Sequence, residues 1–200
     1  MKYRILTRAF AHNPVSETVE TQAHFDVRPR EVWNHLMLYE EVLDPPPILL
    51  RASLPHPVRT EGDKGRLGTV RCVYTGGDLV KRITAVDPPY LLQFNVVAQC
   101  LGIEGCALAL GGSYRISAAS DDTSDVVLRT HYLAFLRPRW LWRPIEKLLV
   151  HQLHRHILGG IGRAILAEYS ASASRAEGSP CLRAARGGVA CTLSQSGSRR

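Results

Sequence analysis

Three side chains of this 200-residue chain could act as acids or bases inside a folded core: Tyr114, Tyr132 and His154. Each lies in or beside an apolar pattern, which would turn it away from water. A tyrosine or histidine in such a place can donate a proton to a carbonyl or an enolate. The structural alternative is that each tyrosine buries its ring and the histidine finds a local partner. We adopt that alternative and assign no catalytic residue.

A second group of polar side chains is the histidine run from His151 to His156. His151 and His154 are three residues apart and could share one face of a helix, as metal ligands do. His156 points elsewhere by the helical count, and no neighbouring cysteine or carboxylate completes a set. We therefore predict a solvated basic face, with no metal and no cofactor.

A third group combines arginines with tryptophans between Arg137 and Pro144. At the start of an amphipathic helix, such residues can rest among the head groups of an anionic membrane. The same side chains could instead anchor the helix and cap the core. Both interpretations stay open for the four residues concerned, which are Arg139, Trp140, Trp142 and Arg143.

The element that would position these groups is a helix predicted from Arg139 to Tyr169. Its apolar residues recur three or four positions apart, as in a helix that lies on a core: they are Trp142, Ile145, Leu149, Leu153, Ile157, Ile161 and Ile165. The run Gly159-Gly-Ile-Gly162 interrupts good helix formers, since each glycine costs about 1 kcal/mol relative to alanine. Close packing of another segment, or a hinge, would explain it.

Before this helix, alternating apolar residues predict a succession of strands. A short helix should begin at Pro29, a second should span Tyr39–Leu43, and Ile48–Leu50 should form a short strand followed by a long loop. The predicted strands are Thr18–Val27, Leu67–Tyr74, Leu79–Val86, Leu91–Ala98, Cys106–Ser117 and Val126–Leu136. Alternation predicts that the residues facing the helix include Phe25, Phe94, Val96, Cys106, Leu108, Leu110, Tyr114, Thr130 and Tyr132.

The net charge of +7 does not indicate a nucleic-acid-binding domain once it is located. Five arginines and one glutamate after residue 170 contribute +4, which leaves +3 for the rest. We predict an N-terminal extension over 1–16, one folded domain over 17–170, and a disordered basic tail rich in Ser, Ala, Gly and Arg over 171–200. No nucleic-acid partner is expected, and the oligomeric state stays open.

The cysteines and the hydropathy pattern indicate a cytoplasmic protein. Five cysteines without a CxxC pair are typical of reduced thiols, and Cys72 and Cys106 are predicted to be buried. Arg8 interrupts the apolar residues near the N-terminus, so no secretory signal is expected. No run of about 18 apolar residues predicts a membrane span.

Several segments, taken in order, resemble the START/Bet v 1-like (SRPBCC) superfamily and its polyketide cyclase/dehydrase-like branch. They are Phe25-Asp-Val-Arg-Pro-Arg-Glu-Val-Trp33, Arg82-Ile-Thr-Ala-Val-Asp-Pro-Pro-Tyr-Leu-Leu-Gln-Phe94, Gly111-Gly-Ser-Tyr114 and the terminal helix. The resemblance covers Thr18 to Tyr169. It implies an α+β helix-grip fold, in which a curved antiparallel sheet wraps around a long C-terminal helix and two short helices follow the first strand.

The resemblance also implies a cavity between sheet and helix for a hydrophobic or amphipathic ligand such as a lipid, polyketide or isoprenoid. It implies no single reaction, because members of one fold differ in activity. We expect a binding protein; the alternatives are a polyketide cyclase or dehydratase that uses a Tyr or His as acid, and a membrane-docking lipid carrier. The predicted lining residues are Phe25, Trp33, Phe94, Val96, Leu108, Leu110, Tyr114, Thr130, Tyr132, Leu149, Leu153 and Ile157.

Overall fold

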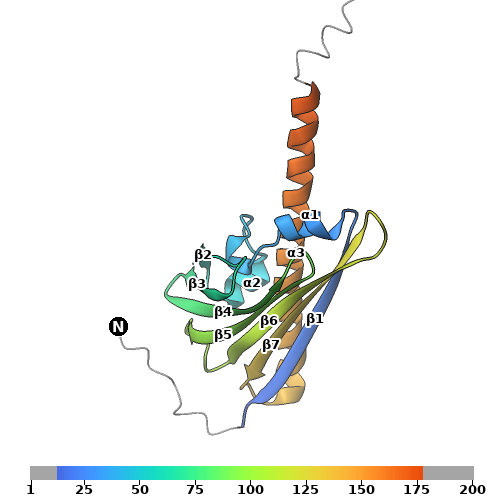
Figure 1. Cartoon of the computed structure of the whole chain (residues 1–200). Helices are drawn as coiled ribbons and strands as arrows, with labels where there is room; N and C mark the ends of the chain where they lie inside the picture. Colours follow the sequence, from blue (N-terminus) through green and yellow to red (C-terminus); the bar gives the residue numbers. More distant parts are fainter. Residues whose placement is uncertain (1–12, 178–200) are drawn as a thin grey trace, which may run out of the picture. The chain divides into compact units, whose positions relative to one another are not determined.

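A computed structural model describes residues 13–177 and contains one seven-stranded antiparallel sheet with the strand order β1-β7-β6-β5-β4-β3-β2. The sheet curves, and the helix α3, as far as Ile165, runs along one of its faces (Figure 1). The strands are β1 (Val15–Phe25), β2 (Pro57–Glu61), β3 (Gly68–Tyr74), β4 (Gly77–Asp87), β5 (Leu91–Cys100), β6 (Ala107–Ala118) and β7 (Ser124–Ala134). The helices are α1 (Pro29–Asn34), the 3-10 turn η1 (Tyr39–Glu41), α2 (Ile48–Ser53) and α3 (Arg139–Glu177).

This architecture confirms the predicted α+β helix-grip fold, with short helices after the first strand. Pro29 occupies the first turn of α1, where a missing N–H costs nothing, and Glu31 lies in the same turn. The long helix begins at the predicted Arg139 and continues past Tyr169 to Glu177. The chain divides into two compact units, residues 1–165 and 166–200, and every strand and short helix belongs to the first. Of the predicted N-terminal extension over 1–16 and the predicted disordered tail over 171–200, residues 1–12 and 178–200 lie outside the described residues. Residues 15 and 16 already belong to β1, and residues 171–177 are helical because α3 continues to Glu177.

The segment between η1 and β3 differs from its prediction. Ile48–Leu50 is the first turn of α2 and not a strand, because a three-residue apolar run carries no period that could distinguish the two. The predicted long loop contains the edge strand β2, which begins at Pro57. Edge strands and the first position of a strand both tolerate proline. The predicted second helix is the 3-10 turn at Tyr39–Glu41.

A register shift in β6 overturns part of the predicted inner face. Tyr114 lies opposite Leu128 of β7, but beyond the shift it is Ala109 that lies opposite Tyr132. One extra residue moves every following side chain to the other face. The shift is fixed at Gly111, where a Cβ would lie 2.4 Å from the carbonyl oxygen of Phe94. Two residues predicted to face the helix, Leu108 and Leu110, therefore lie off the inner face, and Cys106, just before β6, is exposed.

The core of the first unit joins the inner face of the sheet to the middle of α3. Ile157, Ile161 and Ile165 are buried as the predicted stripe requires. Gly160 packs closely, because a Cβ there would lie 3.0 Å from Met37 Sδ and from a methyl group of Val42. At the start of α3 the stripe is wrong, since Ile145 is 38% exposed.

Candidate functional site

The register of the sheet places one row of side chains across the face that α3 covers. Ile83 pairs with Phe94, Phe94 with Gly112, Gly112 with Thr130, and Thr130 with Val19. The ring of Phe94 lies over Gly112, where an added Cβ would come within 3.0 Å of it. This row is apolar except at Thr130, and it forms one wall of the candidate site.

The predicted lining residues differ in how completely they are covered. Tyr114 and Ile157 are buried in the main core cluster. Six others pack against that cluster and keep part of their surface accessible: Phe25, Trp33, Phe94, Val96, Leu149 and Leu153. Along α3 the apolar stripe therefore changes from buried at Ile157 and beyond to half-buried at Leu149 and Leu153.

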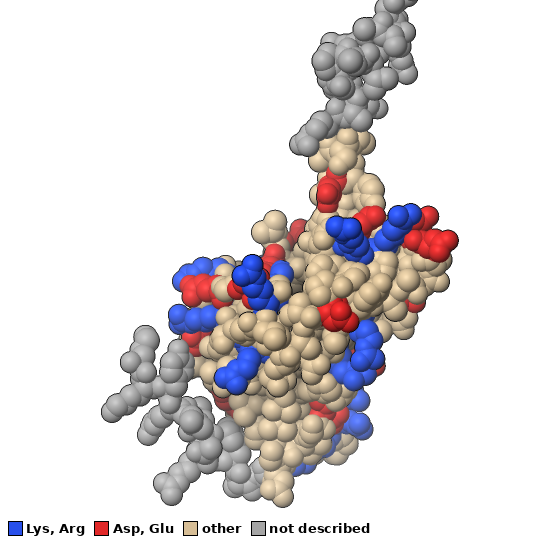
Figure 2. Space-filling model, in the orientation of Figure 1, with Lys and Arg blue, Asp and Glu red and all other residues tan. Residues whose placement is uncertain are grey.

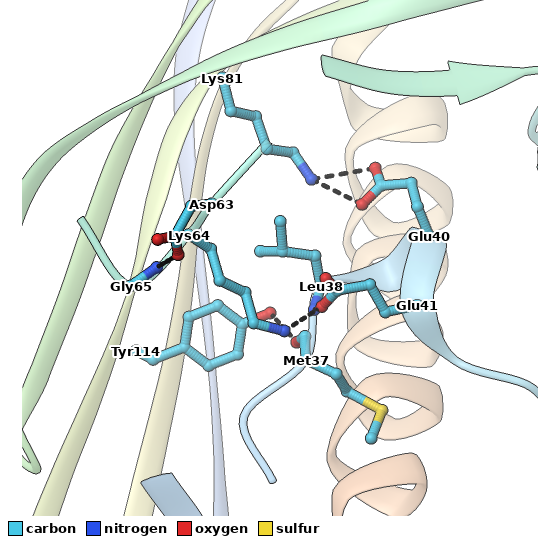
Figure 3. A network of polar contacts seen from close by, with 9 residues as sticks. All are labelled: Met37, Leu38, Glu40, Glu41, Asp63, Lys64, Gly65, Lys81 and Tyr114. Atoms are coloured by element: carbon cyan, nitrogen blue, oxygen red, sulfur yellow. Dashed lines mark hydrogen bonds and ion pairs between the residues drawn. The ribbon is translucent and has the colours of Figure 1, made fainter. Parts of the chain in front are cut away.

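A buried ion pair adjoins this wall (Figure 3). Both carboxylate oxygens of Glu40, from η1, lie 2.9 Å from Nζ of Lys81 on β4. The two side chains are 0% and 7% exposed, and the Tyr74 hydroxyl also donates to Glu40. The ammonium group lies 5.3 Å from the ring centroid of Phe94, within range of a cation–π contact. A full charge thus lies beside an apolar wall.

Each member of this pair holds the other in its charged form. Burial by itself would lower the pKa of Lys81, but the Glu40 carboxylate outweighs it and the pKa is raised. Burial by itself would raise the pKa of Glu40, but the charge of Lys81 and the hydrogen bonds from Lys81, Tyr74 and the backbone together outweigh it, so that pKa is lowered. Neither residue is among the candidates predicted from the sequence. The signal for Lys81 was present, because it alternates with Leu79 and Ile83, both of which are buried.

His154 lies at the opposite side of the row, between two threonines. Its Nδ1 lies 2.8 Å from Thr21 Oγ1, and its Nε2 lies 2.8 Å from Thr130 Oγ1. Burial, helped by the nearby His151, lowers the pKa of His154 to about 4, so the ring is neutral at pH 7. Both ring nitrogens are occupied. His154 therefore cross-links α3 to β1 and β7.

The prediction of a solvated histidine face is wrong for two of its members. His154 is fully buried, and His156 is 8% exposed with its ring 5.9 Å from the Tyr39 ring, centroid to centroid. Within residues 13–177, no three His, Cys, Asp or Glu side chains are grouped as a metal ion requires. Of the two cysteines predicted to be buried, Cys72 is buried and Cys106 is exposed.

The two candidate tyrosines have different surroundings. The Tyr114 hydroxyl donates to the Met37 carbonyl over 2.9 Å (Figure 3), and burial raises its pKa well above the usual value. The Tyr132 hydroxyl is buried without a hydrogen-bond partner among the described residues. Burial and the carboxylates of Glu146 and Glu17 raise the pKa of Tyr132 to about 12. Neither hydroxyl titrates near neutral pH.

The predicted arginine–tryptophan patch does not form one surface. Arg139 is 16% exposed at its side chain and bridges Glu17 at 3.1 Å and Glu146 at 2.7 Å. Trp142 is half-buried, whereas Trp140 is 78% exposed and the Arg143 side chain 57%. Arg139 thus fixes the start of α3 to β1. No helix in residues 13–177 is both long enough and apolar enough to cross a bilayer.

Comparisons with solved structures find the same fold at low sequence identity. Norcoclaurine synthase of Thalictrum flavum, a point mutant in complex with a transition-state analogue, is 11% identical with a TM-score of 0.54, covering 79% of this chain and 99% of its own. A protein of Thermus thermophilus is 16% identical with a TM-score of 0.52, covering 76% and 99%. The Zhui aromatase/cyclase of Streptomyces sp. R1128 is 14% identical with a TM-score of 0.48, covering 77% and 93%.

Comparisons of the sequence alone find no match. No protein-family model matches the chain, and no curated protein does either. The likeness therefore shows the fold. It is the SRPBCC/Bet v 1-like helix-grip fold that the sequence resembles.

Proposed function

We propose that this chain, which has the SRPBCC/Bet v 1-like fold, binds a hydrophobic or amphipathic small molecule between the inner face of its sheet and the first half of α3. The observation that carries the proposal is the change in burial along α3. The stripe is buried at Ile157 and half-buried at Leu149 and Leu153. Phe94 and Val96, on the inner face of the sheet, pack against the same core cluster and are also half-buried. Apolar side chains that face inward and still meet solvent are typical of a ligand site.

A structural neighbour supports the size and character of the ligand. Norcoclaurine synthase of Thalictrum flavum, 11% identical with a TM-score of 0.53, has been solved in complex with dopamine and hydroxybenzaldehyde. Both are small aromatic molecules with polar substituents. Because the two proteins share a fold, we expect by analogy a ligand with an apolar body here.

An enzymatic function has weaker support from the candidate acids. The polar atoms of His154 and Tyr114 form hydrogen bonds within the protein. The pKa of His154 is lowered to about 4 and that of Tyr132 is raised to about 12, both far from the range in which a group exchanges protons at neutral pH. Binding without turnover therefore remains our proposal.

The experiment compares two neighbouring valines of β5. Val96 packs against the core on the inner face, whereas Val97 is 46% exposed on the other side. The full chain is titrated with 1-anilinonaphthalene-8-sulfonate, and apolar molecules that copurify with it are extracted and identified by mass spectrometry. Val96→Trp should fill the space beside Phe94 and weaken dye binding, while Val97→Trp should leave it unchanged.

A thermal melt of each variant shows whether it is folded, and Leu153→Trp tests the same space from α3. The proposal is overturned if the folded wild-type chain takes up no dye and carries no ligand. It is equally overturned if both inner-face variants bind dye as well as Val97→Trp does.

A further inference from the structure

The outward side of the first three turns of α3 is made of apolar residues. Trp140 is 78% exposed, Leu148 49%, Leu141 41% and Ile145 38%. Pro144 is exposed among them. At 100° per residue, these five positions fall within an arc of about 140°. We call them the α3 face. A helix normally turns polar residues to water, so this face indicates a partner other than water.

The charges beside the α3 face have one sign. The side chains of Arg143 and Lys147 are 57% and 37% exposed, and both also pair with the nearly buried Glu17 of β1, at 3.0 and 3.9 Å. Arg155 is exposed about two turns further on. The one carboxylate between residues 137 and 155 is that of Glu146, which is 7% exposed and accepts from Arg139. Around the α3 face, therefore, the exposed charges of the helix are cations. On the side of the molecule drawn in Figure 2, Lys and Arg side chains lie next to Asp and Glu side chains.

We propose that the α3 face docks on an anionic lipid bilayer, with the helix lying along the membrane surface. Exposed Trp and Leu side chains would enter the head-group region, while Arg143, Lys147 and Arg155 would meet lipid phosphates or carboxylates. This face differs from the patch predicted from the sequence, since Arg139 and Trp142 take no part. The proposal does not depend on the proposed ligand site.

A second copy of the chain fits the α3 face less well. In a two-fold symmetric dimer the same patch meets itself, so the cations beside it would approach their own copies. Like charges brought together in this way disfavour association. An anionic surface instead offers opposite charge to the same side chains. The pattern of charge therefore favours a bilayer over a dimer.

The test measures cosedimentation of the full chain with phosphatidylcholine vesicles, with and without phosphatidylserine. We expect binding to the phosphatidylserine vesicles that weakens as salt is added. Replacing both Trp140 and Leu148 by serine should lower vesicle affinity by about tenfold or more. Arg155→Glu should weaken binding to the anionic vesicles. The control is Tyr90→Ser, which changes a side chain that is 51% exposed in the β4–β5 turn.

The proposal is overturned if the folded chain fails to sediment with anionic vesicles, or if the double serine variant binds them as tightly as Tyr90→Ser does. It is also overturned if sedimentation velocity without lipid shows a dimer that the double serine variant abolishes, because the α3 face would then serve a second copy. Because these readouts use no small ligand, they are separate from the dye titration of the proposed site.

Discussion

Replacing Lys81 by methionine should destabilise the protein strongly. Methionine keeps the length of the side chain, but it leaves the Glu40 carboxylate, 0% exposed at its side chain, without its cation. Removing one partner of a buried ion pair typically costs about 3–5 kcal/mol in the free energy of unfolding. For a domain of this size, that corresponds to a drop of about 6–20 °C in Tm.

The double variant Lys81→Met/Glu40→Gln is the matched control. It removes both charges, and the glutamine carbonyl can still accept from the Tyr74 hydroxyl, which donates to Glu40 in the wild type. A buried pair replaced as a unit usually changes stability little. We therefore expect urea denaturation at pH 7 to show a smaller loss for the double variant than for Lys81→Met.

The pH dependence separates a lost charge from lost packing. In the wild type the pKa of Glu40 is lowered, so its contribution is present above the unfolded value and is lost as pH falls. In Lys81→Met the lysine no longer opposes burial, so the pKa of Glu40 should rise, and protonation in acid relieves the buried charge. The stability gap between the two proteins should thus narrow on acidification. An equal loss in single and double variants, with a gap independent of pH, would refute the reasoning.

Three further outcomes are expected. Because burial lowers the pKa of His154 to about 4, the unfolded chain takes up a proton before the folded one does, and the free energy of unfolding should fall by about 3 kcal/mol as pH drops from 6.5 to 4. In His154→Gln, urea denaturation should show a flatter dependence of stability on pH over that range. Gly111→Ala should cost about 2 kcal/mol or more, because the new Cβ would meet the Phe94 carbonyl oxygen in addition to the strain of a positive φ. Gly68→Ala, at nearly the same φ but with open space around it, should cost less and melt at a higher temperature than Gly111→Ala. Iodoacetamide should label exposed Cys100 in the native protein and spare Cys72, whose pKa burial raises to about 12; equal labelling in a peptide map would contradict the structure.

The strands and the long helix could be predicted because their patterns are local. Alternation in β7 and the three-to-four spacing in α3 both follow from one side being buried. The bulge in β6 could not be predicted in this way. Leu108 and Leu110 continue the apolar alternation of Tyr114, and only the pairing with β7 shows that the register shifts between Ala109 and Gly111.

The polar part of the candidate site was missed for a related reason. An ion pair between residues 41 positions apart leaves no local pattern in the sequence. Glu40 lies in a 3-10 turn whose consecutive glutamates are typical of an exposed segment. His154 was named as a candidate, but its two threonine partners lie on different strands. The sequence can thus indicate polar residues on an apolar face. Their hydrogen-bond partners cannot be predicted in the same way, because they depend on the packing of distant elements.

The polar groups around the row of side chains limit the kind of ligand that the site can hold. Polar groups lie at both sides of the row, the charged Glu40–Lys81 pair at one and the neutral His154 with Thr130 at the other. Between them lie Phe94 and Gly112, which offer a ring face and no polar side chain. Because Glu40, Lys81, His154 and Thr130 already have partners in the protein, a ligand that displaced those partners would have to replace their hydrogen bonds. A molecule that presents an apolar body to Phe94 and Val96 avoids that cost, so we expect apolar contact to dominate affinity in the dye titration and in any natural ligand.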